Sequence, residues 1–156
     1  MADVIVVYVT RSGHSRSYAK DLAGKLSAPT YEIVDLVPRK GIIGWLRAGA
    51  QARAGKATPI RDPGVGLVGV TQVVLVQPIW ASMVAPPMRS WIRAHKPELA
   101  GKRISLFVAY GGSFLDRFKL NFQREFGPIA AFGAIAQGDS AELKERQIEE
   151  FVRALH

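Results

Sequence analysis

An unbroken run of apolar, mostly β-branched residues occupies positions 4–9, and a turn rich in hydroxyl groups follows it directly at positions 10–15. A run without polar alternation is typical of a strand that is covered on both faces, as in a parallel sheet with helices on each side. A helical pattern begins immediately after the turn, with Tyr18, Ala19 and Leu22 on one apolar stripe. The turn is therefore predicted to lie at the carboxyl end of a strand and at the amino end of a helix.

The composition of this turn indicates an anion site. The amino end of a helix presents N–H groups without a partner, together with the positive end of the helix dipole. The turn adds three hydroxyl groups and one permissive glycine, which are Thr10, Ser12, Ser15 and Gly13. Arg11 and His14 either complement a phosphate dianion or are exposed loop residues, and both interpretations stay open. The residues of this turn predict that it binds a phosphate.

The rest of the chain alternates between strand-like and helix-like segments. Strands are predicted at residues 4–9, 31–36, 70–77, 103–110 and 129–137, with helices at 15–26, 39–58, 86–96, 115–126 and 141–155. Residues 59–69 are predicted to be a surface loop. Strict alternation implies a parallel sheet with helices on both faces, and ligands bind at the carboxyl ends of such strands. A chain of 156 residues is expected to form one domain, spanning residues 1–156.

Two further loops follow predicted strands and meet the first turn at the same edge of the sheet. One spans residues 77–82 and contains Trp80, a large aromatic residue among small ones. The other spans residues 109–113 and places Tyr110 before two glycines. A phosphate joined to a flat ring would satisfy all three loops.

In these loops the chain resembles the flavodoxin-like FMN-binding family, and the resemblance extends over essentially the whole chain. The first loop has the family's form hydroxyl-x-hydroxyl-Gly-x-hydroxyl, with His14 where asparagine is common. Pro78 and Trp80 match a Pro-x-Trp in the second loop. Tyr110 with the Gly-Gly after it matches the third loop.

The resemblance implies an α/β three-layer sandwich with a five-stranded parallel sheet in the order 2-1-3-4-5. It also implies a non-covalently bound FMN cofactor, with Trp80 covering one face of the isoalloxazine ring and Tyr110 as a further ring contact. The expected FMN-binding residues are Thr10, Arg11, Ser12, Gly13, His14, Ser15, Pro78, Ile79, Trp80, Ala81, Ala109, Tyr110, Gly111 and Gly112. No separate catalytic residue and no metal site are expected.

Three functions stay open at this point. The first is an FMN-binding redox protein that transfers electrons between redox partner proteins. The second is an FMN-dependent reductase that takes hydride from NAD(P)H and reduces a quinone-like acceptor. The third is a flavin-free anion-binding or interaction module on the same fold, which would use the basic segment at residues 39–56.

Missing residue types exclude several other classes of protein. The chain has no cysteine, so disulfides, thiolate metal sites and a cysteine nucleophile are absent. Of the three glycines of a dinucleotide-binding G-x-G-x-x-G motif only Gly13 is present, and no lysine occupies the first loop as in a P-loop. Thr10 and Gln77 stand near the positions where receiver domains need acidic residues.

Charge and hydropathy limit the partners and the location. The net charge is +8, but the basic residues are scattered and are interpreted as a solvated surface, so no specific nucleic-acid partner is expected. No apolar run approaches the roughly 20 residues of a membrane-spanning helix, and no basic region precedes the first apolar run. No transmembrane segment and a cytoplasmic location are therefore expected. His95 and His156 are predicted to be surface residues.

Overall fold

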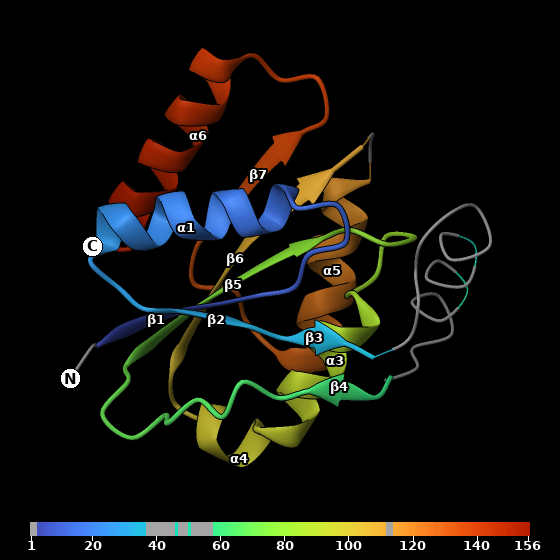
Figure 1. The fold of residues 1–156 in the computed structure, drawn as a ribbon, viewed down its shortest axis with the longest axis vertical. Helices are drawn as coiled ribbons and strands as arrows, with labels where there is room; N and C mark the ends of the chain where they lie inside the picture. Colours follow the sequence, from blue (N-terminus) through green and yellow to red (C-terminus); the bar gives the residue numbers. More distant parts are fainter. Residues whose placement is uncertain (1–2, 37–45, 47–49, 51–57, 112–113) are drawn as a thin grey trace.

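The computed structural model describes residues 3–36, 46, 50, 58–111 and 114–156, and a five-stranded parallel sheet forms its centre (Figure 1). The strands of this sheet are β1 (Val4–Tyr8), β2 (Thr30–Glu32), β5 (Gln72–Pro78), β6 (Arg103–Tyr110) and β7 (Phe132–Ala136). Their order is β2-β1-β5-β6-β7, and every neighbouring pair is parallel. Counted along the chain this is the order 2-1-3-4-5, so the predicted fold class is confirmed.

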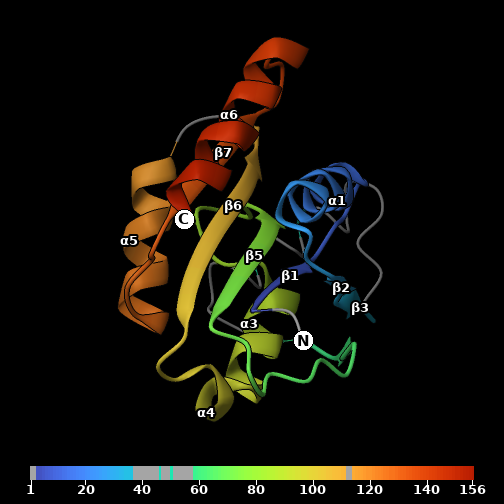
Figure 2. The same ribbon diagram turned by 90° about the vertical axis from the view of Figure 1, so that its left-hand side faces the viewer.

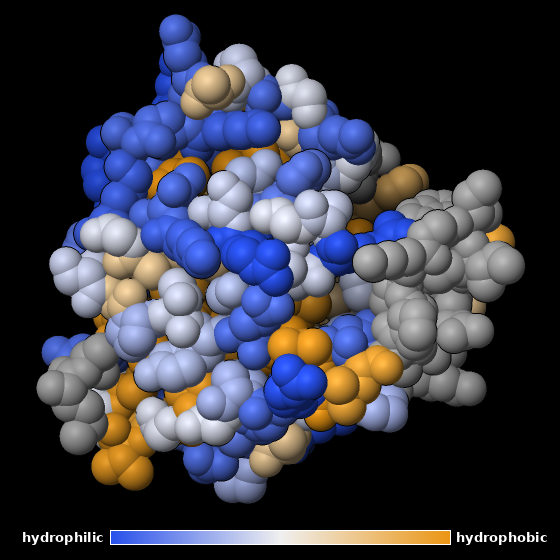
Figure 3. Space-filling model, viewed as in Figure 1, coloured by the Kyte–Doolittle hydropathy of each residue, from blue (hydrophilic) through white to orange (hydrophobic). Residues whose placement is uncertain are grey.

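The helices form a layer on each side of the sheet (Figures 1 and 2). One layer contains α1 (His14–Leu26) and α6 (Ala141–Ala154), and the other contains α3 (Pro86–Ala94) and α5 (Leu115–Phe126). The short helix α4 (Lys96–Leu99) follows α3 directly. Figure 3 shows that hydrophilic residues cover most of the surface over α1 and α6, as expected for helices that bury only one stripe.

The first strand supplies both hydrophobic cores. Ile5 and Val7 belong to the core under α3 and α5, whereas Val6 and Tyr8 belong to the core under α1 and α6. All four are at most 5% exposed. Successive side chains of a strand point to opposite faces, so a strand buried on both faces needs an unbroken apolar run.

The predicted strand at residues 31–36 is split in the structure. Only β2 joins the main sheet, and its last hydrogen bond to β1 runs from the Ile33 N–H to the Tyr8 carbonyl at 2.9 Å. The chain then forms β3 (Val34–Asp35), which pairs antiparallel with β4 (Ile60–Arg61) in a small second sheet. The prediction of one continuous strand is therefore wrong.

The connector at residues 59–69 is predicted to be a surface loop, but in the structure it is only partly one. It contains β4, and it buries Val65 and Leu67 to 5% and 3% exposure in the core under α3. The helix predicted at residues 39–58 lies outside the described residues, apart from positions 46, 50 and 58. No described helix is long and apolar enough to cross a membrane.

His95 is predicted to be a surface residue, but in the structure it is largely buried. Its side chain is 14% exposed and is held between two carboxylates, with Nε2 2.6 Å from Asp62 Oδ2 and Nδ1 2.9 Å from Glu98 Oε1. The imidazole also lies 4.8 Å from the ring of Trp91, which is fully buried. This cluster joins the connector after β4 to the end of α3.

Candidate functional site

The first loop ends in the amino terminus of α1, and its geometry leaves backbone N–H groups for a ligand. Gly13 has a positive φ of 94°, which glycine adopts readily, and gives the helix no side-chain cap. Its own N–H donates to Thr10 Oγ1 at 2.9 Å, so Thr10 closes the loop from within. The first turn of α1 contains no acidic residue. The first N–H groups of a helix have no partner inside it, so this end favours an anion.

Arg16, a cation on the first turn of α1 next to this loop, is partly neutralised by an ion pair with Glu32. The guanidinium of Arg16 donates to both carboxylate oxygens of Glu32, at 2.9 and 3.0 Å, and Tyr8 Oη donates to the same carboxylate at 3.0 Å. These hydrogen bonds raise the pKa of Arg16, and burial together with Glu32 raises the pKa of Tyr8. Arg16 is not among the residues that line the cavity beside the loop, and the basic residues that do line it are Arg11 and His14.

The second loop is a tight turn with a strained backbone. Ala81 and Ser82 have positive φ values of 51° and 59°, and the Met83 N–H donates to the Trp80 carbonyl at 2.9 Å. Two central residues with positive φ define a type I′ turn, a conformation in which glycine and asparagine are favoured. Asn121 of α5 supports the turn by donating from Nδ2 to the Ser82 carbonyl at 2.9 Å. Trp80 is held at 9% exposure beside this turn.

The third loop follows β6 and passes close to the end of β7. The Gln137 N–H donates to the Tyr110 carbonyl at 2.7 Å. A Cβ placed on Gly111 would lie 3.3 Å from Gln137 Oε1, which is a tight contact, so a glycine suits this position. Gly112, the last of the predicted site residues, lies outside the described residues.

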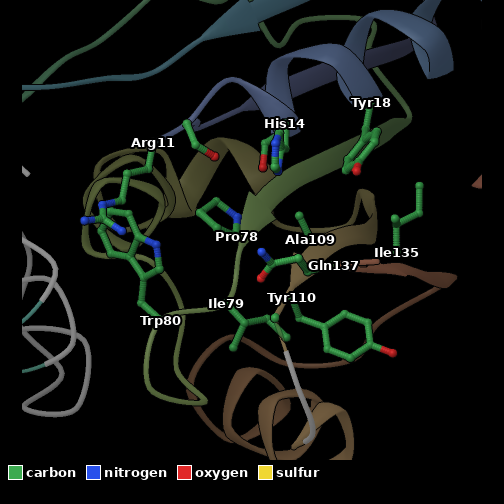
Figure 4. Close-up of a pocket in the computed structure, with 13 residues that line it drawn as sticks. Arg11, His14, Tyr18, Pro78, Ile79, Trp80, Ala109, Tyr110, Ile135 and Gln137 are labelled. Atoms are coloured by element: carbon green, nitrogen blue, oxygen red, sulfur yellow. The ribbon is translucent and has the colours of Figure 1, made fainter. Parts of the chain in front are cut away.

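The three loops line one cavity of about 370 Å³ (Figure 4). Ten of the predicted site residues line it, namely Arg11, Ser12, His14, Ser15, Pro78, Ile79, Trp80, Ala109, Tyr110 and Gly111. Thr10, Gly13 and Ala81 shape the loops but are not among the lining residues. Figure 4 shows Arg11 and Trp80 toward one end of the cavity, with Tyr110 and Ile135 toward the other.

Three lining residues were missed by the sequence reasoning. Ile135 and Gln137 lie at the end of β7, the fifth strand of the same parallel sheet. The carboxyl ends of parallel strands share one edge of a sheet, so the position of these two residues at the end of the fifth strand could have predicted that they lie near the site. Tyr18 lies one turn after His14 on α1, and its ring is held edge-on at 6.2 Å from Phe107.

The chemistry of the cavity suits an anionic group joined to a flat apolar one. Helix N–H groups and serine hydroxyls lie in the first loop, and aromatic and aliphatic side chains line the remainder. No Asp or Glu is among the described residues that line it. The described residues also contain no cluster of three His, Asp or Glu side chains able to hold a metal ion. The walls can therefore bind and orient a ligand, but they offer no carboxylate as a general base.

No family model and no curated protein sequence matches the chain. Among solved structures, it is similar to a flavoprotein in complex with FMN from Lactobacillus acidophilus NCFM, with a TM-score of 0.73 and 12% identity over 97% of this chain and 99% of that one. Flavodoxin 1 from Bacillus cereus matches with a TM-score of 0.55 and 11% identity over 99% and 97%. An NADPH-quinone reductase from P. pentosaceus matches with a TM-score of 0.57 and 10% identity over 98% and 96%. The chain thus has the flavodoxin-like fold.

Proposed function

We propose that this protein binds FMN without a covalent link at the carboxyl edge of its sheet and transfers electrons through it. The observation that supports this most is that one cavity combines the amino terminus of α1 with the side chain of Trp80. The similarity to an FMN complex of the same fold adds support. When bound, FMN supplies the redox chemistry, and the protein supplies binding, orientation and control of access.

The first loop would hold the phosphate. The N–H groups at the start of α1 lie where an anion is stabilised, and Ser12 and Ser15 line the cavity there. Arg11 would add positive charge from the cavity wall, and the ring of His14 would add a hydrogen-bonding group. Thr10 and Gly13 would act indirectly, because their mutual hydrogen bond fixes the shape of the loop.

The second and third loops would hold the ring. Trp80 would cover one face, and its position depends on the strained turn at Ala81. Pro78, Ile79 and Ala109 would contact the ring from the strand ends, and Tyr110 and Gly111 from the third loop. Gly112 is proposed on the sequence pattern alone.

A second candidate is an FMN-dependent NAD(P)H:quinone-type reductase, because one similar structure is an NADPH-quinone reductase. The two functions differ in whether NAD(P)H reduces the FMN-bound protein directly. Anaerobic mixing with NADPH separates them: loss of the visible flavin absorbance within seconds supports the reductase, whereas no bleaching over minutes supports a carrier that is reduced by a protein partner.

The binding proposal is tested by titrating the flavin-free protein into FMN and into riboflavin while flavin fluorescence is recorded. Riboflavin has the same ring but lacks the phosphate. Because charge-assisted hydrogen bonds to a phosphate are strong, FMN should bind roughly a hundredfold more tightly. Equal affinity for both flavins would contradict the role of the first loop. No quenching by either flavin would overturn the proposal and favour a flavin-free module.

A further inference from the structure

A second cavity, of about 430 Å³, lies at the opposite edge of the sheet from the candidate site. Leu75 on β5 and Ile104 on β6 form its sheet side. Ile104 precedes Tyr110 by six positions on β6, which corresponds to about 20 Å along a strand. The two cavities share no lining residue. The second cavity is therefore a separate candidate site, independent of the proposed FMN site.

The interior of this cavity is apolar. Phe122 and Phe126 of α5 contribute two rings whose centroids are 5.2 Å apart, and α3 contributes Ile92. Leu75 and Phe122 are 0% and 1% exposed, so the floor is part of the hydrophobic core. A volume of a few hundred Å³ with such walls is typical of sites for small organic ligands. The walls select a ligand with an aliphatic or aromatic body.

The charges at the rim of the cavity are positive. Lys96 and Lys102 line it, and no described Asp or Glu does. Lys102 Nζ donates to the Val70 carbonyl at 2.7 Å, which fixes its ammonium group while leaving its charge and two further donors. Lys96 is exposed, and no described carboxylate forms an ion pair with it.

The nearby acidic residues are already engaged with other cations. Glu98, on the same short helix as Lys96, is paired with His95 at 2.9 Å. Glu125 of α5 is paired with Arg89 at 2.6 Å and lies 3.6 Å from Arg93. The positive charge of the two lysines is therefore available to an anion that enters the cavity.

We propose that this cavity binds a small apolar carboxylate, with its hydrocarbon body against Ile92, Ile104 and Phe126, above the buried floor, and its carboxylate at Lys96 and Lys102. The apolar interior disfavours a sugar or a nucleotide, because their hydroxyl groups would be buried without partners. The lysines favour the acid over the corresponding alcohol, because only the acid is charged at neutral pH. Within a series of saturated acids, each added methylene that becomes buried should increase affinity about fourfold.

The proposal is tested by NMR on the full chain with labelled methyl groups, titrated with sodium octanoate and, separately, with octanol. Octanoate should shift the methyl resonances of Leu75, Ile92 and Ile104, with a dissociation constant of about 0.1–1 mM. It should leave the indole resonance of Trp80 unchanged. Shorter acids should bind progressively more weakly.

Two variants test the role of the charge. Lys96→Gln should weaken octanoate binding about threefold to fivefold and leave octanol binding unchanged. The matched control is Arg103→Gln, which removes a positive charge from an exposed residue outside the cavity wall and should change neither.

Each contrary result has a definite meaning. If octanoate shifts none of the three methyl groups, the cavity is only a packing void and the proposal is wrong. If octanol binds as tightly as octanoate, the carboxylate class is wrong. Octanoate shifts confined to Trp80 would place the ligand at the other edge and would equally overturn the proposal.

Discussion

The cavity at the carboxyl edge of the sheet and the cavity at the amino edge share strands β5 and β6 but have different walls. At the carboxyl edge, Pro78 and Tyr110 end their strands beside the start of α1, where backbone N–H groups and serine hydroxyls gather. At the amino edge, aliphatic and aromatic side chains of α3 and α5 form the walls, and the charges come from two lysines.

This difference follows from the direction of the chain. In a parallel sheet with crossover helices, strands end and helices begin at the same edge, so the positive ends of helix dipoles lie there. At the other edge the helices end, and their carbonyl groups disfavour an anion. Backbone groups can therefore bind an anion at the carboxyl edge, whereas at the amino edge side-chain charge has to supply the attraction.

The largest effect is expected from removing the aromatic wall of the carboxyl-edge cavity. Trp80→Ala should weaken FMN binding about tenfold to hundredfold, because stacking on an aromatic side chain contributes about 1–3 kcal/mol. The measurement is a fluorescence titration of the flavin-free variant. Phe114→Ala is the matched control, since Phe114 is an exposed aromatic near the start of α5 that does not line the cavity. Equal losses in both variants would contradict the assigned role of Trp80.

The strained turn beside Trp80 should become more stable when glycine replaces alanine. Ala81 has a φ of 51°, which costs about 1 kcal/mol or more for a residue with a Cβ. Ala81→Gly should therefore raise the melting temperature by about 2–4 °C. The control is Ala100→Gly, where φ is −58° and glycine should give no gain. A lower melting temperature for Ala81→Gly would show that the turn is not strained.

The free energy of unfolding should fall as the pH rises above neutral, because His95 then loses its proton. Burial lowers the pKa of His95, but hydrogen bonds to Asp62 and Glu98 outweigh it and leave the pKa raised above 6.5. A raised folded-state pKa means that protonation stabilises the fold below the unfolded value, and that this stabilisation disappears as pH rises through the folded value. The contribution should be about 1 kcal/mol, measured by urea unfolding at pH 6 and pH 8.5.

The variant His95→Gln should remove most of this pH dependence between pH 6 and 8.5. Asp62 acts in the opposite direction, because its pKa is lowered by its hydrogen bonds with Gly64 and His95 despite its burial. The stability that Asp62 contributes is present above its unfolded-state pKa and is lost as the pH falls through its lower folded-state pKa. An unchanged slope in His95→Gln would assign the pH dependence to other groups.

The smallest effect is expected from releasing a cation beside the first loop. Glu32→Gln removes the carboxylate that neutralises Arg16, so FMN should bind about two- to fivefold more tightly at low salt. Glu145→Gln is the matched control, because it releases Lys25 in the last turn of α1, at the other end of the helix. The gain should vanish in high salt. Equal gains in both variants would indicate general charge rather than a local effect.

The order of elements and the three loops could be predicted because each depends on short stretches of sequence. The apolar run at residues 4–9 needs only its own pattern to indicate a doubly covered strand, and α/β alternation then brings the strand ends to one edge. The Ser140 cap of α6 was also predictable, and its Oγ accepts from the Leu143 N–H at 3.1 Å. The binding roles of the site residues themselves stay a prediction.

What could not be predicted depends on contacts between residues far apart in the chain. The pairing of Arg16 with Glu32 follows from the register of β2 beside β1, which residue patterns do not specify. The exit of the chain after Ile33 depends on β4, nearly 30 residues later. The amino-edge cavity is space left between side chains of five elements, and no local pattern encodes such a space.

The most direct test of the contrast between the two edges is an NMR titration of the flavin-free protein with FMN. We expect shifts of the Ser12 and Ser15 amides and of the Trp80 indole, because these groups line the carboxyl-edge cavity. The methyl groups of Ile92 and Ile104, at the amino edge, should not shift. Shifts at Ile92 and Ile104 without shifts at Trp80, or no shifts at saturating FMN, would contradict the account.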